Sequence, residues 1–156
     1  MLKPAVVLPG LNATAAVLRI QGLQLMFPQN EVRTLEAASD VDGNAPLPGS
    51  AGWINYLRQR WPVYCLSEQL VLQMEVPVER RACALFALNQ GYLGLLCDDV
   101  AIMKQVNSQN FALPTIMRNA HTPIQSMLIQ DGRLLCASSA QQLAAYLEHL
   151  VKGRQT

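Results

Sequence analysis

Charged side chains are scarce in this sequence, and neither sign is gathered into a block. Asp, Glu, Lys and Arg make up 15% of the 156 residues, against about 25% in an average globular domain. The formal net charge is +1, and the longest basic run is Arg80-Arg81. Such a chain offers no electrostatic attraction to nucleic acid or to an acidic membrane surface. We therefore expect no nucleic-acid partner.

Long apolar runs are also missing, and none approaches the roughly 20 residues that a membrane-spanning helix needs. We expect a protein that is not inserted in a membrane. Near the N-terminus, Lys3 and the small residues Ala13-Thr14-Ala15 resemble a secretory leader, but Pro9-Gly10 interrupts the short apolar segment between them. We interpret residues 1–14 as an N-terminal tail and the protein as cytoplasmic.

The residue groupings that mark reactive or metal-binding sites are absent as well. The four cysteines are far apart, the two histidines stand alone, and no Cys-x-x-Cys or glycine-rich phosphate signature occurs. Each cysteine lies in an apolar run, which is typical of an inert, buried thiol in a reducing cytoplasm. Spacing alone leaves one alternative open, a nucleophilic pair such as Cys136 with His121.

Two acidic stretches could suggest a catalytic or metal site. Asp98-Asp99 has the composition of an acid/base or magnesium pair, but apolar segments flank it, so we interpret it as a turn at a strand end. The segment from Asp40 to Asn44 resembles a calcium loop, but its glycine comes too early and Ala51 stands where a bidentate Glu should fall. The sequence predicts no catalytic residue, no metal and no cofactor.

Apolar residues are plentiful at 51%, and they recur in one arrangement: an apolar run, a short turn with glycine, and another apolar run. Three copies predict β-hairpins over residues 17–27, 83–97 and 126–136, because such turns supply the positive φ that tight hairpins require. The apolar excess also indicates exposed apolar surface for a protein partner, or a surface whose polarity comes from the abundant Gln instead.

A fourth strand-turn-strand pattern runs from Gly52 to Leu66. The predicted turn is Arg58-Gln59-Arg60, and Pro62 in the second strand indicates an edge position or a bulge. The three hairpins in one small chain predict an all-β, mainly antiparallel fold. Residues 31–38 fit a strand or a helical turn leading into one.

Apolar residues are consecutive from Cys83 and from Leu134, which implies burial on both faces, as in a barrel or a covered sheet. One helix is predicted over residues 140–152, with Ser138 or Ser139 as its cap and Gly153 as its stop. We expect its apolar stripe to dock on the sheets. The stripe consists of Leu143, Leu147, Leu150 and Val151.

The segment from Gly52 to Leu66 resembles the signature of CheW-like domains, the coupling proteins of bacterial chemosensory systems. Matching residues are Gly52, Ile54, Asn55, Pro62, Val63 and Leu66. The family continues its asparagine with Leu-Arg-Gly and ends the second strand with Asp, where this chain has Tyr56-Leu57-Arg58 and Cys65. Either Arg58 takes the arginine's role from one position on, or that contact is lost. Residues 89–100 and 125–137 are similar to later family segments, so the resemblance spans Ala16 to Leu147.

This resemblance implies two SH3-like five-stranded β-barrels in one chain, with a C-terminal helix, over residues 15–152. It also implies a scaffold without catalytic activity, for chemotaxis or pilus-based motility. The implied partners are a chemoreceptor (a methyl-accepting chemotaxis protein), bound at a groove between the barrels, and the regulatory domain of a histidine kinase, bound at a barrel edge. Within the family, the alternative is a divergent member that has lost one partner or self-associates. From another class, it is a small β-barrel protein that binds a ligand or acts through a cysteine.

On the resemblance, the candidate partner surface consists of Val32, Leu35, Asn55, Leu57, Arg58 and Trp61. A tryptophan beside an arginine at a strand edge is also the composition of an interface hot spot. The alternative is that Trp61 and Trp53 fill barrel cores while Arg58 and Arg60 solvate the turn.

Overall fold

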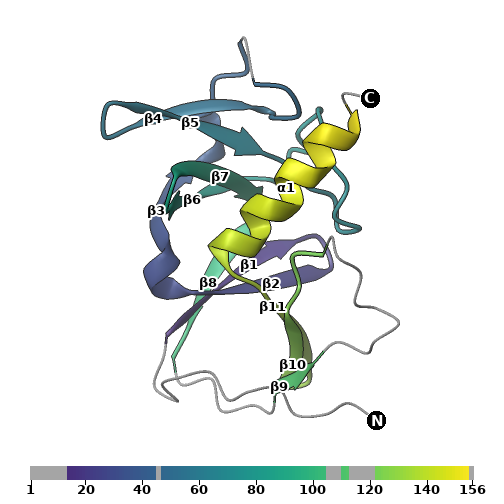
Figure 1. The fold of residues 1–156 in the computed structure, drawn as a ribbon. Coiled ribbons are helices and arrows are strands. Elements are labelled where there is room, and N and C mark those ends of the chain that lie inside the picture. The colour runs from purple at the N-terminus through teal and green to yellow at the C-terminus, as the bar shows by residue number, and fades with distance from the viewer. Residues whose placement is uncertain (1–13, 45–46, 105–109, 113–121, 155–156) are drawn as a thin grey trace.

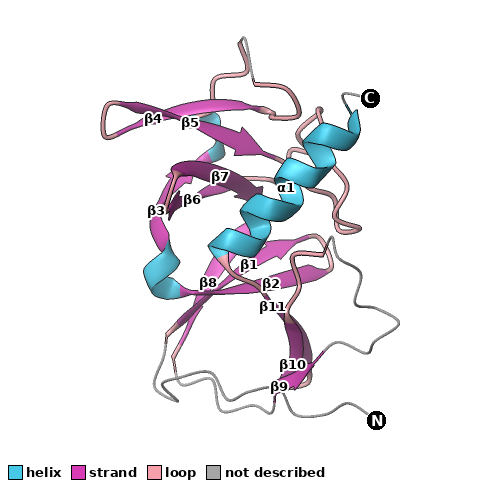
Figure 2. Cartoon of the chain, viewed as in Figure 1, coloured by secondary structure: helices cyan, strands magenta, loops and turns pink. Residues whose placement is uncertain are grey.

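The computed structural model describes residues 14–44, 47–104, 110–112 and 122–154, which form two β-sheets and a C-terminal helix (Figure 1, Figure 2). The first sheet contains β1 Ala15–Ile20, β2 Leu23–Pro28, β8 Asp99–Met103, β9 Asn110–Ala112, β10 Ser126–Gln130 and β11 Arg133–Ala137. The second contains β3 Val32–Ala37, β4 Gly52–Tyr56, β5 Gln59–Tyr64, β6 Ala82–Leu88 and β7 Gly91–Cys97. The helical elements are the 3-10 turns η1 Gln29–Glu31 and η2 Ala38–Asp40 and the helix α1 Ala140–Arg154.

The strand order is β8-β1-β2-β11-β10-β9 in the six-stranded sheet and β3-β6-β7-β5-β4 in the five-stranded sheet. The pairs β2–β11 and β5–β7 are parallel, and the other pairs of described strands are antiparallel. The predicted all-β, mainly antiparallel fold is confirmed. One sheet has six strands instead of the five expected, because the short β9 adds to the edge beside β10.

All four predicted hairpins form, and each closes through a two-residue turn. The closing pairs are Ile20 with Leu23, Tyr56 with Gln59, Leu88 with Gly91, and Gln130 with Arg133. The chain from Val32 to Ala37 is a strand, which settles the choice left open for residues 31–38.

Three apolar clusters fill the molecule. The five-stranded barrel encloses one, made of Ile54, Trp61, Val63, Cys65, Cys83, Leu85 and Leu96. The six-stranded barrel encloses another, made of Ala15, Val17, Met26, Leu128, Leu135 and Ala137. The largest cluster joins residues of both sheets with the helix, and its biggest fully buried side chains include Phe27, Phe86, Leu25 and Leu95.

This arrangement explains why some strands are apolar at consecutive positions. In β6, Cys83 and Leu85 point into the five-stranded barrel, while Ala84 and Phe86 point into the cluster between the sheets. Successive side chains of a strand face opposite sides, so both faces of β6 are buried. The prediction of two-sided burial is confirmed for the run from Cys83. It is wrong at the start of the second run, because Leu134 is 54% exposed.

The helix α1 runs across both sheets on one side of the molecule, from the end of β11 toward β5 (Figure 1). Its Leu143 and Leu147 are buried in the central cluster, and Leu150 and Val151 pack against that cluster, as predicted. Ser139 is the cap, since its Oγ accepts a hydrogen bond from the Gln142 N–H at 3.2 Å. The predicted stop at Gly153 is wrong: the helix continues through this glycine to Arg154.

The position of Pro62 follows from the hydrogen-bond pattern of its strand. β5 is not an edge, since it lies between β4 and β7. However, β7 pairs with it only from Val63 on, so Pro62 pairs with Trp53 of β4 alone. The backbone of Trp53 bonds to Asp42 on its other side, which makes Trp53–Pro62 a pair without mutual hydrogen bonds. The missing N–H of Pro62 therefore removes no hydrogen bond between strands. The predicted edge position holds only locally, at the start of β5 that β7 does not reach.

Candidate partner-binding site

The tip of the β4–β5 hairpin presents two of the predicted partner-binding residues. Leu57 and Arg58 form the turn, with φ values of 51° and 62°. A type I′ turn requires this left-handed backbone at both central positions and favours Asn and Gly there. Leu57 is nevertheless 66% exposed, and Arg58 is exposed as well. The turn therefore presents a leucine and an arginine to solvent in a backbone conformation that both residues disfavour.

This turn lies one residue earlier than predicted. The expected polar turn was Arg58-Gln59-Arg60, but β5 already begins at Gln59, which pairs with Tyr56. The physical reason is that a two-residue I′ turn matches the twist of the flanking strands, whereas the composition of a segment does not fix where a turn ends. Leu57 thereby leaves the strand and becomes part of the turn.

Trp61 is a core residue, so the structure corrects its assignment to the partner surface. It is 4% exposed, and its ring centroid lies 4.5 Å from that of Tyr92 and 5.5 Å from that of Tyr56. Its indole N–H donates to the Tyr56 carbonyl oxygen at 3.0 Å. The hairpin register pairs Trp61 with Ile54, on the face that points into the barrel.

Trp53 lies instead on the outer face of the same hairpin. It is only half-buried, and the Arg60 guanidinium stacks over its ring at 4.2 Å from the centroid. Its indole N–H donates to the Asn44 carbonyl oxygen at 2.8 Å. The tryptophan–arginine pair typical of a hot spot is therefore Trp53 with Arg60. Sequence reasoning missed this pair, although the alternation of Trp53 and Asn55 with Ile54 and Tyr56 carried the signal.

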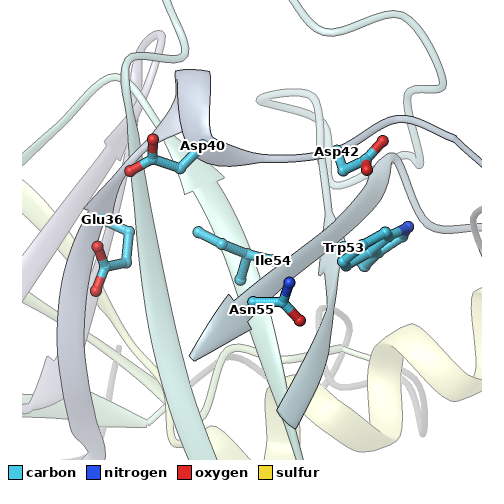
Figure 3. A pocket seen from close by; sticks show the side chains of 6 residues that line it. All are labelled: Glu36, Asp40, Asp42, Trp53, Ile54 and Asn55. Atoms are coloured by element: carbon cyan, nitrogen blue, oxygen red, sulfur yellow. The ribbon is translucent and has the colours of Figure 1, made fainter. Parts of the chain in front are cut away.

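β3 and β4 are the two edges of the five-stranded sheet, and a pocket lies between them (Figure 3). Asp42, in the segment that follows β3 and η2, pairs with Trp53 of β4 through reciprocal backbone hydrogen bonds of 2.8 and 2.9 Å. We call the opening between β3 and β4 the seam. The pocket at the seam has a volume of about 280 Å³ and is lined by Glu36, Asp40, Asp42, Trp53, Ile54 and Asn55.

The predicted surface residues divide into two groups. Leu35 of β3, at 46% exposed, and Asn55, Leu57 and Arg58 of the β4–β5 hairpin all reach the surface of one barrel. Val32 is half-buried and packs against the cluster between the sheets. The carboxylates of the pocket were not predicted as part of a site. The one hint of such a site is the position of Glu36 in β3, where half-buried and exposed residues alternate and Glu36 is one of the half-buried ones.

Asp98 has a structural position that accounts for the acidic pair Asp98-Asp99. Its Oδ1 accepts a hydrogen bond from buried Arg80 at 2.6 Å, and its Oδ2 accepts one from the Gln21 N–H at 2.8 Å. Arg80 also donates to the Leu66 carbonyl oxygen at 3.1 Å. This ion pair ties the β1–β2 turn to the chain that precedes β6. Both carboxylate oxygens of Asp98 therefore make structural contacts, which agrees with the interpretation of Asp98-Asp99 as a turn at a strand end.

The four cysteines are free and buried. Burial raises the pKa of the Cys83 thiol and of the Cys97 thiol to about 12. Burial also raises the pKa of Cys65 and that of Cys136 above the ordinary value. A raised pKa suppresses the thiolate, which is the nucleophilic form. His121, the partner considered for Cys136, lies outside the described residues.

Within the described ranges, no group of His, Cys, Asp and Glu side chains is placed to hold a metal ion. No helix in the described part of the chain has the length and apolar character needed to cross a bilayer.

Comparisons with known proteins agree with this architecture. The family model described as CheW-like domain matches residues 15–148. The crystal structure of the scaffolding protein TtCheW from Thermoanaerobacter tengcongensis superposes with a TM-score of 0.65 at 14% sequence identity, covering 81% of this chain and 88% of that one. At this identity the match shows a shared fold, the pair of SH3-like β-barrels. No curated protein matches the sequence. Since the family model covers most of the chain, this protein belongs to the CheW-like domain family.

Proposed function

We propose that this protein is a non-enzymatic adaptor of a bacterial chemosensory system, which bridges a chemoreceptor and the regulatory domain of a histidine kinase in the cytoplasm. The output is chemotaxis or pilus-based motility. The observation that carries the proposal is the exposed Leu57-Arg58 turn at the edge of a barrel, in a chain of the CheW-like family. Four buried, unpaired cysteines fit a reducing compartment.

The kinase contact is assigned to the β3–β4 side of the five-stranded barrel. Among the described strands, β4 has a neighbour in the sheet on one side only, so part of its backbone is open to a partner. Leu57 adds apolar area, while Arg58 and the Trp53–Arg60 stack add the side chains that most often dominate binding energy. These features are the ones by which strand edges recognise other chains.

Exposed apolar side chains elsewhere support a second contact. Ile129 and Leu134 lie directly opposite each other on β10 and β11, and they are 58% and 54% exposed. Val71, Met74, Val76 and Val78 are exposed along the connection between β5 and β6. These exposed side chains are the residues that could form the apolar partner surface expected from the composition.

The test is a two-sided capture experiment with purified proteins. A chemoreceptor cytoplasmic fragment is immobilised, and retention of the kinase regulatory domain is measured with and without this protein. We expect retention only when the protein is present, and Arg58→Glu should reduce it at least fivefold because the charge at the turn is reversed. Lys104→Glu, at an exposed lysine that follows β8 and lies outside both proposed contacts, is the matched control and should retain the kinase normally.

Kinase retention that is independent of this protein would refute the bridging role. Equal retention by wild type and Arg58→Glu would refute the site but leave the adaptor intact. Light scattering on the protein alone tests the alternative of a divergent, self-associating family member. A stable oligomer that binds neither partner would support that alternative over the adaptor.

A further inference from the structure

Within the described residues, the backbone of β4 is largely unpaired on the side that faces the seam. Trp53 uses its N–H and C=O to bond Asp42, and residues two apart in a strand direct these groups to the same side. The backbone N–H and C=O of Asn55 therefore also face the seam. In the described part of the chain, no strand pairs with β4 on this side beyond the Asp42–Trp53 bridge. An unpaired edge of this kind is a template for an added strand.

The seam is also acidic. Glu36, Asp40 and Asp42 line the pocket together with the uncharged Trp53, Ile54 and Asn55 (Figure 3). Arg60, stacked on the Trp53 ring, supplies one compensating cation, so an excess of negative charge remains. Two of these carboxylates already accept hydrogen bonds from neighbours: Glu36 Oε1 from the Thr34 hydroxyl at 3.4 Å, and Asp42 Oδ1 from the Asn44 N–H at 2.9 Å. A carboxylate accepts several hydrogen bonds, so each retains capacity for a cationic side chain.

The size of the pocket limits what can enter it. Its volume of about 280 Å³ lies just below the roughly 300–1,000 Å³ of sites that enclose drug-sized ligands. One long side chain fits this space better than a cofactor does. An open edge and an acidic pocket beside it match an extended chain that pairs through its backbone and inserts a cation.

We propose that the seam between β3 and β4 receives an extended segment of a partner protein that carries lysine or arginine. The segment pairs with β4 beyond Trp53 and directs a cationic side chain to Glu36, Asp40 and Asp42. This inference rests on the proposed function, because it names the kind of partner segment that the adaptor's edge binds.

The probe is a fluorescein-labelled peptide of alternating arginine and valine, and binding is followed by fluorescence anisotropy. Two control peptides separate charge from strand pairing. One replaces arginine with glutamate, and the other keeps arginine but carries N-methyl groups on alternate backbone nitrogens, which blocks pairing along one edge. We expect only the unmodified basic peptide to bind, with an affinity that falls as salt is raised.

Changes in the protein locate the binding. The variant Glu36→Gln/Asp40→Asn removes two carboxylates at little steric change and should weaken the basic peptide by roughly tenfold. Glu75→Gln/Glu79→Gln removes two exposed carboxylates outside the pocket and should bind as wild type does. In two-dimensional NMR, the Trp53 indole and Asn55 amide signals should shift on titration with the peptide, and the Glu148 amide should not.

Three results would overturn the inference: binding of the N-methylated peptide as tight as that of the basic peptide, an unchanged affinity in Glu36→Gln/Asp40→Asn, or a dimer of the protein that this variant dissociates. The last result would mean that a second copy fills the seam. None of them depends on kinase retention in the capture experiment, so the inference and the proposed function fail separately.

Discussion

Trp53 and Trp61 show how much a residue's role depends on its register. They lie in adjacent strands of one hairpin, yet the pairing of Ile54 with Trp61 and of Trp53 with Pro62 sends the two rings to opposite faces. Trp61 becomes part of an aromatic cluster inside the barrel, whereas Trp53 supports Arg60 at the surface. The two tryptophans should respond differently to truncation.

Trp61→Ala is expected to lower the free energy of unfolding by about 3–5 kcal/mol, because it leaves a large cavity in a packed core. Trp53→Ala removes a half-buried ring and should cost much less stability while weakening kinase binding. Urea unfolding of both variants measures the difference. Equal stability losses would contradict the assignment of Trp61 to the core.

Asp98 and Asp99 form a second matched pair of neighbours. Asp98 faces buried Arg80, so Asp98→Ala leaves an uncompensated buried charge and should destabilise the protein by about 3–5 kcal/mol. Asp99 pairs with Arg19 at the surface, and Asp99→Ala should have a far smaller effect. Thermal unfolding of the two variants measures both losses of stability. A larger loss for Asp99→Ala would show that the buried pair does not hold the fold.

The cysteines predict a pH dependence. Burial raises the pKa of Cys83 and of Cys97 to about 12, so these thiols stay protonated in the native state up to strongly alkaline pH. Iodoacetamide at pH 8 should therefore label none of the four cysteines before unfolding and all four in denaturant. Mass spectrometry reads the result. A cysteine labelled rapidly in the native protein would revive the cysteine-dependent alternative.

At the scale of the element, the β4–β5 turn combines local strain with exposure. Leu57 and Arg58 each adopt a left-handed backbone, which disfavours residues that carry a Cβ atom. The exposed side chains contribute little to the core, so selection for folding alone would favour Asn-Gly at these positions.

The double substitution Leu57→Asn/Arg58→Gly should therefore stabilise the protein by about 1–2 kcal/mol while reducing kinase binding. Chemical denaturation and the capture experiment test the two effects on the same samples. Increased stability with unchanged binding would show that the turn is not the contact.

Elements joined by local signals were predictable, and those joined over long distances were not. Glycine turns located three hairpins, and the β4–β5 hairpin followed from its apolar runs. The parallel pairs β2–β11 and β5–β7 had no sequence signature, because they join segments far apart in the chain. The same holds for Glu31, whose Oε1 accepts the Ala140 N–H at 2.7 Å and so ties η1 to the start of α1.

The candidate site shows the same division. Asn55, Leu57 and Arg58 were found because a family signature passes through them. The pocket carboxylates lie 13 or more positions before these residues, on β3 and the segment after it, so only the closure of the barrel brings Glu36 and Asp40 toward Asn55. Trp61 was misplaced because composition does not reveal which face of a strand points inward.

At the scale of the whole molecule, the two barrels share their largest core. Side chains from both sheets and from α1 meet in one cluster, which fixes the barrels relative to each other. The faces that meet there are buried, so binding is left to the edges and turns that point outward. A rigid body with separate outward edges suits a protein that holds two partners at a fixed geometry.

Hydrogen–deuterium exchange of this protein with and without the kinase regulatory domain shows which edge the partner covers. Binding is expected to protect backbone amides in β3, β4 and the Leu57-Arg58 turn and to leave α1 unchanged. Protection confined to α1 and the six-stranded barrel, or no protection at saturating kinase domain, would contradict the proposed contact.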